Sequence, residues 1–218
     1  MRALTLLALG LVSLAALPGL ARAEDAPAHL LGTFRVTYYF VAEERGTGRW
    51  PLYAPACGAV LAHTSREFHH ELSLEGTGRL RDGRLLNFSE RCDCARPGHG
   101  GSRVCYEWLD RGEFPWGKGA RLEGRDLPLR PFRSIAVDPS RIPVGAVIYI
   151  PAWRQGHWPD GSPRDGCLRA EDTGSRVLGW HVDVFVGRPE WASALQRDGA
   201  VSVRAYLNAP ECAHWEGG

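Results

Sequence analysis

Short runs of β-branched and aromatic residues, separated by Gly, Pro and Asp, are the feature of this sequence that most restricts its fold. The chain has no sustained helical heptads and no internal repeats. The runs lie at residues 33–41, 58–63, 134–138, 146–152, 181–187 and 201–207. Strands of this length between turn residues are typical of a small barrel or sandwich, so the sequence predicts an all-β protein. One short helix is expected at 188–199, which has a proline near its first turn and ends at a glycine.

The first residues of the chain predict export. Arg2 precedes an apolar run at residues 3–20, and small residues then stand at Ala21 and Ala23. We expect a signal peptide over residues 1–23, cleaved after Ala23, and a bacterial periplasmic or secreted protein. The apolar run is shorter and more interrupted than a membrane span of about 20 residues. We therefore expect no membrane span after cleavage, with an uncleaved anchor as the alternative.

The cysteines of the predicted mature chain favour disulfides, because they are even in number and the chain is exported. They are Cys57, Cys92, Cys94, Cys105, Cys167 and Cys212. We expect a bond between Cys167 and Cys212, since both lie in loops of the C-terminal half. The alternative is a zinc site formed by Cys92, Cys94, Cys105 and His99. Its first two cysteines stand closer in sequence than the usual zinc pair, and we predict neither a metal nor a cofactor.

Residues 24–218 are long enough for a single domain. Within it, residues 71–127 differ in character: they are rich in Gly and Cys and include a hairpin signal, "RDGR". This segment is expected to be a disulfide-stapled insertion that packs on or beside the barrel. The net charge of +1 and the scattered arginines exclude a nucleic-acid binder. The "FHHEL" stretch at 68–72 lacks the spacing of a zinc metalloprotease motif.

Aspartates stand at the ends or in the middle of three predicted strands. Asp138 precedes a proline, Asp172 opens a loop that contains glycines, and Asp183 lies between two valines in "HVDVFVG". Charged residues are rarely fully buried unless they are paired or functional. The pattern therefore indicates either a buried structural network or an acid–base site.

The order of these motifs resembles the three-aspartate (3D) domain family. The resemblance covers residues 133–207 through "AVDP", "IPVG", "EDTG" and "HVDVFVG", and "RVTYYF" is similar to the family's opening strand. It implies a six-stranded double-psi β-barrel and a peptidoglycan lytic transglycosylase, which cleaves the bond between N-acetylmuramic acid and N-acetylglucosamine and leaves 1,6-anhydro ends. It also implies that Asp183 is the catalytic acid and Asp172 its partner. The expected substrate-binding residues are Asp138, Thr37, Gly174, Ser175 and Trp180.

The chemistry agrees with this assignment. A carboxylic acid delivers a proton near neutral pH only if burial or a neighbouring carboxylate raises its pKa. We expect both causes at Asp183, with Asp172 as the neighbour. The sequence departs from the family at Ser175, where the family has a second glycine after Asp-Thr-Gly.

Two other functions stay open on the sequence alone. The first is a non-catalytic barrel that binds cell-wall glycan, and the second is a stapled inhibitor or effector whose insertion makes the contact. The expected partner in the enzymatic reading is the peptidoglycan glycan strand, and we expect a monomer.

Overall fold

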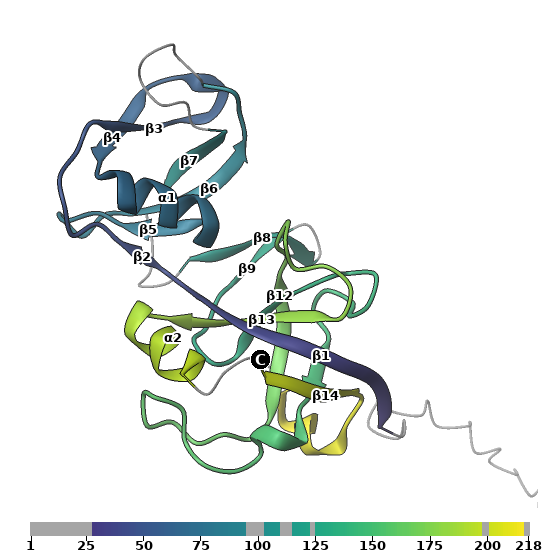
Figure 1. The fold of residues 1–218 in the computed structure, drawn as a ribbon. Helices are drawn as coiled ribbons and strands as arrows, with labels where there is room; N and C mark the ends of the chain where they lie inside the picture. Colours follow the sequence, from purple (N-terminus) through teal and green to yellow (C-terminus); the bar gives the residue numbers. More distant parts are fainter. Residues whose placement is uncertain (1–27, 95–102, 110–114, 123–124, 198–200, 216–218) are drawn as a thin grey trace, which may run out of the picture.

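The computed structural model describes residues 28–94, 103–109, 115–122, 125–197 and 201–215. These residues form a β-barrel and a smaller β-rich unit, connected by one long strand that runs out of the barrel (Figure 1). The expected signal peptide, residues 1–23, lies outside the described residues. Within the described part of the chain, no helix has the length and apolar character needed to cross a membrane.

Six strands close into a mixed barrel in the order β1-β13-β10-β12-β11-β14. They are β1 (His29–Phe40), β10 (Ser134–Val137), β11 (Val147–Tyr149), β12 (Cys167–Asp172), β13 (His181–Gly187) and β14 (Val201–Leu207). The pairs β1–β13 and β10–β12 are parallel, and the other neighbouring pairs are antiparallel. A mostly β protein with a six-stranded barrel is therefore confirmed. That the strands cross in the double-psi manner stays a prediction.

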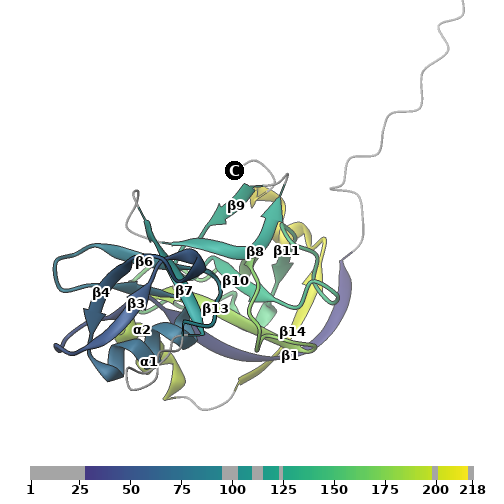
Figure 2. The same cartoon turned by 90° about the horizontal axis from the view of Figure 1, so that it is seen from above.

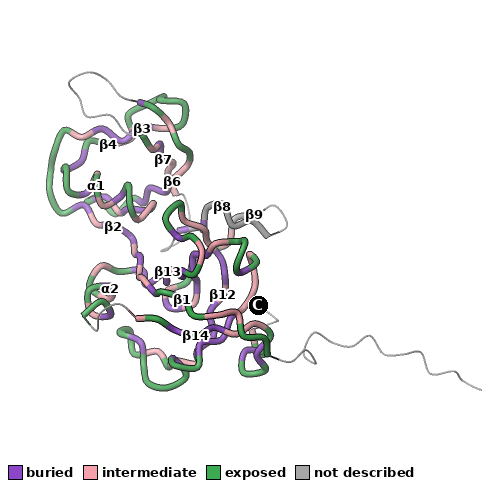
Figure 3. Tube along the Cα trace, turned by 45° about the vertical axis from the view of Figure 1, so that its right-hand side comes forward, coloured by how far each residue is buried: buried purple, intermediate pink, exposed green. Residues whose placement is uncertain are grey.

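Alternation along the strands decides what the barrel encloses. Phe34 and Val36 of β1 and Val182 and Val184 of β13 are buried in the largest hydrophobic core. Successive side chains of a strand point to opposite faces. Arg35, between Phe34 and Val36, and Asp183, between Val182 and Val184, therefore lie on the outer face of the barrel. Along β1, buried Phe34 and Val36 flank exposed Arg35; along β13, buried Val182 and Val184 flank half-buried Asp183, and the rest of the strand is buried (Figure 3).

A second unit, which we call the lobe, is made of the described residues between 42 and 109. Its main sheet has the order β2-β5-β6-β7, and a hairpin of β3 and β4 and the helix α1 complete it (Figures 1 and 2). The elements are β2 (Ala42–Glu43), β3 (Trp50–Tyr53), β4 (Val60–Thr64), α1 (Arg66–Glu75), β5 (Thr77–Arg79), β6 (Leu85–Arg91) and β7 (Val104–Leu109). The insertion was expected to begin at residue 71, but the chain already leaves the barrel at β2. Strands β3 and β4 pair with each other, outside the barrel.

The helix content exceeds the one helix expected. The predicted helix is confirmed as α2 (Pro189–Gln196), whose proline stands in the first turn. A second helix, α1, begins after Ser65, whose Oγ accepts a hydrogen bond from the Phe68 N–H, and it ends at Gly76 in the left-handed region. Its buried residues, Phe68 and Leu72, stand at helical spacing in the "FHHEL" stretch. Short 3-10 segments add η2 (Pro55–Cys57), η3 (Pro151–Trp153) and η4 (Pro210–Trp215).

A two-stranded ribbon lies against the barrel strand that ends in Asp172. It consists of β8 (Trp116–Leu122) and β9 (Arg125–Pro128). Gly117 of β8 lies so close to β12 that a Cβ built on it would be 2.0 Å from the Glu171 carbonyl oxygen. Only glycine fits at this approach, which fixes the ribbon beside the end of β12.

Three disulfides connect the six cysteines, as predicted, and Cys167–Cys212 is among them. The other two, Cys57–Cys94 and Cys92–Cys105, both lie in the lobe. The four lobe sulfurs are close enough together to resemble a metal-binding set, but they are bonded in pairs. His99, which the zinc alternative required, lies outside the described residues.

Candidate active site

The predicted acid lies on the outer face of the barrel, where β1 and β13 run parallel. Their register places Arg35 beside His181 and Thr37 beside Asp183. Because parallel neighbours in register present the same face, the four side chains form one row. The structure thus brings together Thr37 and Asp183, which are 146 residues apart in sequence.

Hydrogen bonds connect this row into a chain. The Thr37 hydroxyl donates to Asp183 Oδ1 at 2.6 Å, and the same Oγ1 lies 2.8 Å from His181 Nε2. His181 Nδ1 lies 3.2 Å from an Arg35 guanidinium nitrogen. Asp183 is therefore held at one of its two carboxylate oxygens by a hydroxyl that is itself hydrogen-bonded.

Burial is the main electrostatic influence on Asp183. It raises the pKa of the carboxyl from 3.8 to about 6, because a low-dielectric surrounding disfavours the charged form. The Thr37 hydrogen bond and the positive charge of Arg35 both lower the pKa and oppose this effect. Asp172, which was expected to raise the pKa of Asp183, is not among its causes.

The position of Asp172 explains this difference. On β10, Ala136 pairs with Asp172 on one side and with Asp183 on the other. Two strand spacings of about 4.8 Å therefore separate the two aspartates, with the small side chain of Ala136 between them. Asp172 instead accepts a hydrogen bond from the Tyr39 hydroxyl at 2.9 Å and one from the Thr173 N–H at 2.8 Å.

Tyr39 belongs to the site although the sequence did not single it out. It stands two residues after Thr37 and thus on the same face of β1. Burial, followed by the charge of Asp172 and then that of Asp183, raises the pKa of its hydroxyl well above the ordinary value. Tyr39 is consequently neutral, and it donates to Asp172 while lying in the field of Asp183. The alternation in "RVTYYF" is the signal that could have identified it.

A second acid with a raised pKa comes from the lobe. Glu75 is the last residue of α1, and its Oε2 accepts a hydrogen bond from the Phe40 N–H at 3.0 Å, where β1 leaves the barrel. Burial raises the pKa of Glu75 to about 8, and the charge of Asp183 adds to this. The Glu75 carboxyl is therefore predominantly neutral at pH 7. Its sequence context, the end of a helix that was not predicted, gave no sign of this.

Asp138, a predicted substrate-binding residue, fastens the loop between β12 and β13. Its Oδ2 accepts from the Gly179 N–H at 2.7 Å, and its Oδ1 accepts from the Ser140 N–H at 2.9 Å. These bonds lower its pKa, because they favour the ionised carboxyl. Oδ2 thus holds the loop between β12 and β13, and Oδ1 closes the turn that follows β10.

The other predicted contact residues lie along the same loop. Trp180 is 47% exposed, and its ring packs over Gly32, where a Cβ would come within 2.4 Å of it. The Arg141 guanidinium covers the ring at 4.6 Å from its centroid. Gly174 has no room for a Cβ beside Val177, while Ser175 is exposed.

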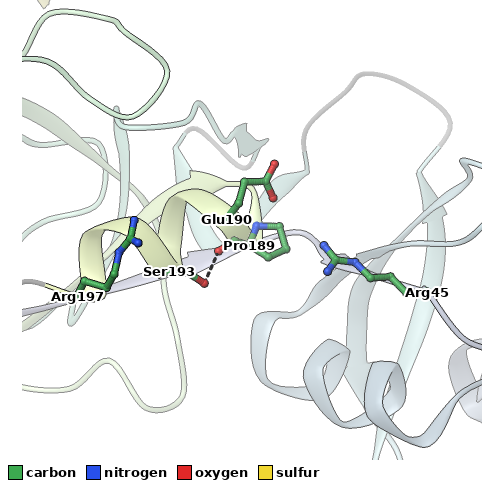
Figure 4. Close-up of a pocket in the computed structure, with 5 residues that line it drawn as sticks. All are labelled: Arg45, Pro189, Glu190, Ser193 and Arg197. Atoms are coloured by element: carbon green, nitrogen blue, oxygen red, sulfur yellow. Dashed lines mark hydrogen bonds between the residues drawn. The ribbon is translucent and has the colours of Figure 1, made fainter.

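A cavity of about 510 Å³ lies at α2 (Figure 4). It is lined by Arg45, Pro189, Glu190, Ser193 and Arg197. Ser193 donates to the Pro189 carbonyl at 3.0 Å, and Arg45 lies 3.0 Å from Glu43. None of the lining residues belongs to the candidate site.

Comparison with known proteins agrees with the barrel. Residues 133–206 match the model of the 3D domain. This chain contains a 3D domain. Asp138, Asp172 and Asp183 all lie within it, whereas Thr37 on β1 and Glu75 in the lobe lie before it. No curated protein matches the chain.

Solved structures extend the similarity beyond the 3D domain to the lobe. E. coli MltA with bound chitohexaose matches with a TM-score of 0.54 and 16% identity, over 81% of this chain and 71% of that one. A membrane-bound lytic murein transglycosylase from Agrobacterium tumefaciens matches with a TM-score of 0.56 and 15% identity, over 80% and 73%. MltA from Neisseria gonorrhoeae matches with a TM-score of 0.54 and 14% identity, over 80% and 72%. At these identities the likeness is one of fold.

Proposed function

We propose that the protein is a peptidoglycan lytic transglycosylase in which Asp183 acts first as the acid and then as the base. The observation that carries this is the partly buried carboxyl of Asp183, with a pKa near 6, tied through Oδ1 to Thr37 on the outer face of the barrel. The 3D domain match and the lytic transglycosylase neighbour from Agrobacterium support it. So does the E. coli neighbour, which bound the oligosaccharide chitohexaose.

In the proposed reaction, protonated Asp183 gives its proton to the oxygen between N-acetylmuramic acid and N-acetylglucosamine, and the bond from that oxygen to C1 breaks. The Asp183 carboxylate then takes the proton of the muramic acid C6 hydroxyl as that oxygen bonds to C1. The product carries a 1,6-anhydro ring, no water is consumed, and Asp183 regains its proton. One carboxyl is enough, because it changes role between the two steps.

The raised pKa makes this cycle workable. With a pKa of about 6, about a tenth of Asp183 is protonated at pH 7. At its ordinary pKa of 3.8 the fraction is below roughly one in a thousand. The same pKa leaves the carboxylate basic enough to accept the C6 proton in the second step.

The proposal includes the setting of the reaction. The substrate is the glycan strand of peptidoglycan, so the protein works in the periplasm or outside a bacterial cell after its signal peptide is removed. We propose that it acts as a monomer, without metal or cofactor, on a barrel of the double-psi type.

The test is turbidity loss of purified peptidoglycan from pH 4 to pH 8, with wild type and Asp183→Asn compared. The variant is expected to lose activity by about a hundred- to ten-thousand-fold, because an amide delivers no proton. Asp160→Asn is the matched control, since Asp160 is exposed and, among the described residues, its side chain bonds only to Ser162 in its own turn. Wild-type activity in Asp183→Asn would refute the assignment.

The non-catalytic alternative predicts a different result in the same experiment. Leu178 and Trp180 are exposed beside the site, at 66% and 47%, and offer apolar contact to a sugar. If wild type sediments with peptidoglycan but releases no product at any pH, the protein is a glycan-binding barrel.

A further inference from the structure

His181 is buried beside the proposed acid, yet the proposed reaction gives it no role. Its side chain is 7% exposed, and both ring nitrogens have neighbours. Nε2 lies 2.8 Å from Thr37 Oγ1, and Nδ1 lies 3.2 Å from the Arg35 guanidinium and 3.3 Å from the Arg176 carbonyl oxygen. A buried imidazole with three polar contacts is oriented by all of them.

The donors and acceptors of this chain can be assigned by counting protons. The Thr37 hydroxyl has one proton, which it donates to Asp183 Oδ1, so its oxygen accepts from His181. His181 must then carry its proton on Nε2. A neutral imidazole has one N–H, so Nδ1 accepts, and Arg35 supplies the donor. The donors therefore run from Arg35 through His181 and Thr37 to Asp183.

The surroundings keep His181 neutral, as this assignment requires. Burial and the charge of Arg35 lower the pKa of the imidazole, while its contact with the Arg176 carbonyl acts in the opposite direction. A proton on Nδ1 would gain the Arg176 carbonyl but would face the Arg35 cation. The neutral ring with hydrogen on Nε2 is the form that leaves every donor in the chain paired.

We propose that His181, as its Nε2–H tautomer, is a positioning residue that aims the Thr37 hydroxyl at Asp183 Oδ1 and so leaves Oδ2 to exchange the proton with the glycan. The role in proton exchange rests on the proposed function, whereas the hydrogen bonds among Arg35, His181, Thr37 and Asp183 do not depend on it. Hydrogen bonds in a chain polarise one another. His181 therefore strengthens the bond from Thr37 to the ionised form of Asp183.

Several titratable or charged groups lie around Asp183. Arg35 and Tyr39 come from β1, Asp172 from β12, and Glu75 from α1, and His181 is its neighbour on β13. Arg35 and Thr37 lower the pKa of Asp183. Replacing His181 removes none of these groups, but it takes away the Nδ1 contact of Arg35 as well as the Nε2 contact of Thr37.

The first measurement is the tautomer of His181 by ¹⁵N NMR of the full mature chain at pH 7 to 8, with disulfides intact. We expect a protonated Nε2 and an unprotonated Nδ1. A proton on Nδ1 would overturn the proposal, because Thr37 would then donate to His181 and leave Asp183 without its donor. This measurement uses the wild type, so it does not depend on the folding of any variant.

The second measurement is the pKa of Asp183 by ¹³C NMR of the carboxyl in His181→Leu, His181→Gln and Thr37→Val. Thr37→Val removes the hydrogen bond and is expected to raise the pKa by roughly one to two. His181→Leu keeps the Thr37 hydroxyl but removes the group that aims and polarises it, for a rise of roughly 0.5. His181→Gln keeps an amide donor near the Nε2 position, so the pKa stays near that of the wild type. An unchanged pKa in His181→Leu would also overturn the proposal.

Activity separates this inference from the proposed function. In His181→Leu the basic limb of the pH–rate profile is expected to move upward with the pKa of Asp183, and kcat is expected to fall while KM does not. His181→Gln is expected to restore both. If wild type cleaves no peptidoglycan but the NMR results hold, the proposed function is wrong and the positioning role of His181 is retained. If wild type cleaves and His181→Leu keeps its pH profile, the positioning role of His181 is wrong and the proposed function is retained.

Discussion

Asp183 is expected to lower the stability of the protein, and Asp183→Asn should reveal by how much. Burial raises the pKa of the carboxyl from 3.8 to about 6, so the folded state disfavours its ionisation. Below pH 3.8 the carboxyl is neutral in both folded and unfolded chains, and stability is unaffected. Between pH 3.8 and 6 the unfolded chain ionises first, so stability falls as pH rises, and above pH 6 the loss is complete.

The magnitude follows from the two pKa values. Each pKa unit corresponds to about 1.4 kcal/mol, so ionised Asp183 destabilises the fold by about 3 kcal/mol. Asparagine has nearly the same shape, keeps an oxygen that accepts from Thr37, and never ionises. The free energy of unfolding of Asp183→Asn, minus that of the wild type, is therefore expected to grow by about 3 kcal/mol between pH 3.5 and pH 8.

The assay is urea unfolding of both proteins at these two pH values, with all disulfides intact. The change in unfolding free energy caused by the substitution is compared between the two pH values, so any pH-independent effect of the substitution on packing cancels. Equal differences at pH 3.5 and pH 8 would refute the reasoning, since they would mean that Asp183 is not buried as an ionisable group. A stabilised but inactive variant is the pattern expected of a strained catalytic residue.

Three further outcomes are expected. Glu75→Gln should flatten the pH dependence of the unfolding free energy between pH 5 and pH 8, by up to about 3.5 kcal/mol, because the pKa of Glu75 is raised from 4.5 to about 8 and the loss grows as pH rises; an unchanged slope in urea unfolding would contradict this. Replacing Cys167 and Cys212 with alanine opens a loop of 45 residues and should lower the unfolding free energy by about 4 kcal/mol, which urea unfolding measures; a loss below about 1 kcal/mol would count against it. Asp172→Asn should slow peptidoglycan cleavage less than Asp183→Asn does and leave the pH optimum in place, because burial sets the pKa of Asp183; a shifted optimum in the turbidity assay would show coupling between the two carboxyls.

The barrel strands differed in how well the sequence could reveal them. Five of the six lie in runs of β-branched and aromatic residues, which carry their own signal. The sixth, β12, holds Arg169, Glu171 and Asp172, so its composition does not indicate a strand. Its burial depends on tertiary partners: Ser134 on β10 and Arg130 both donate to Glu171. Contacts of this kind cannot be read from the strand itself.

The site divides in the same way. Asp183 could be found because a carboxyl between valines is conspicuous, and the ordered motifs supported it. The alternation in "RVTYYF" places Tyr39 on the same face as Thr37, but its contact with Asp172 could not be found from the sequence, and neither could the role of His181. Both depend on the parallel register of β1 and β13 and on the sheet order beyond them. Glu75 depends on the lobe helix reaching the end of β1. Pairings between residues 35 to 146 positions apart decide these contacts, and local sequence does not encode them.

The most direct test of the account is the chemistry of the ends that the protein leaves on peptidoglycan. Purified peptidoglycan is digested with wild type or Asp183→Asn, and the soluble products are analysed by mass spectrometry. The account predicts fragments ending in 1,6-anhydro-N-acetylmuramic acid from the wild type and essentially none from the variant. Reducing ends, which are heavier by one water, would contradict it by showing hydrolysis, and the absence of any product from the wild type would contradict it by showing that the barrel does not cleave.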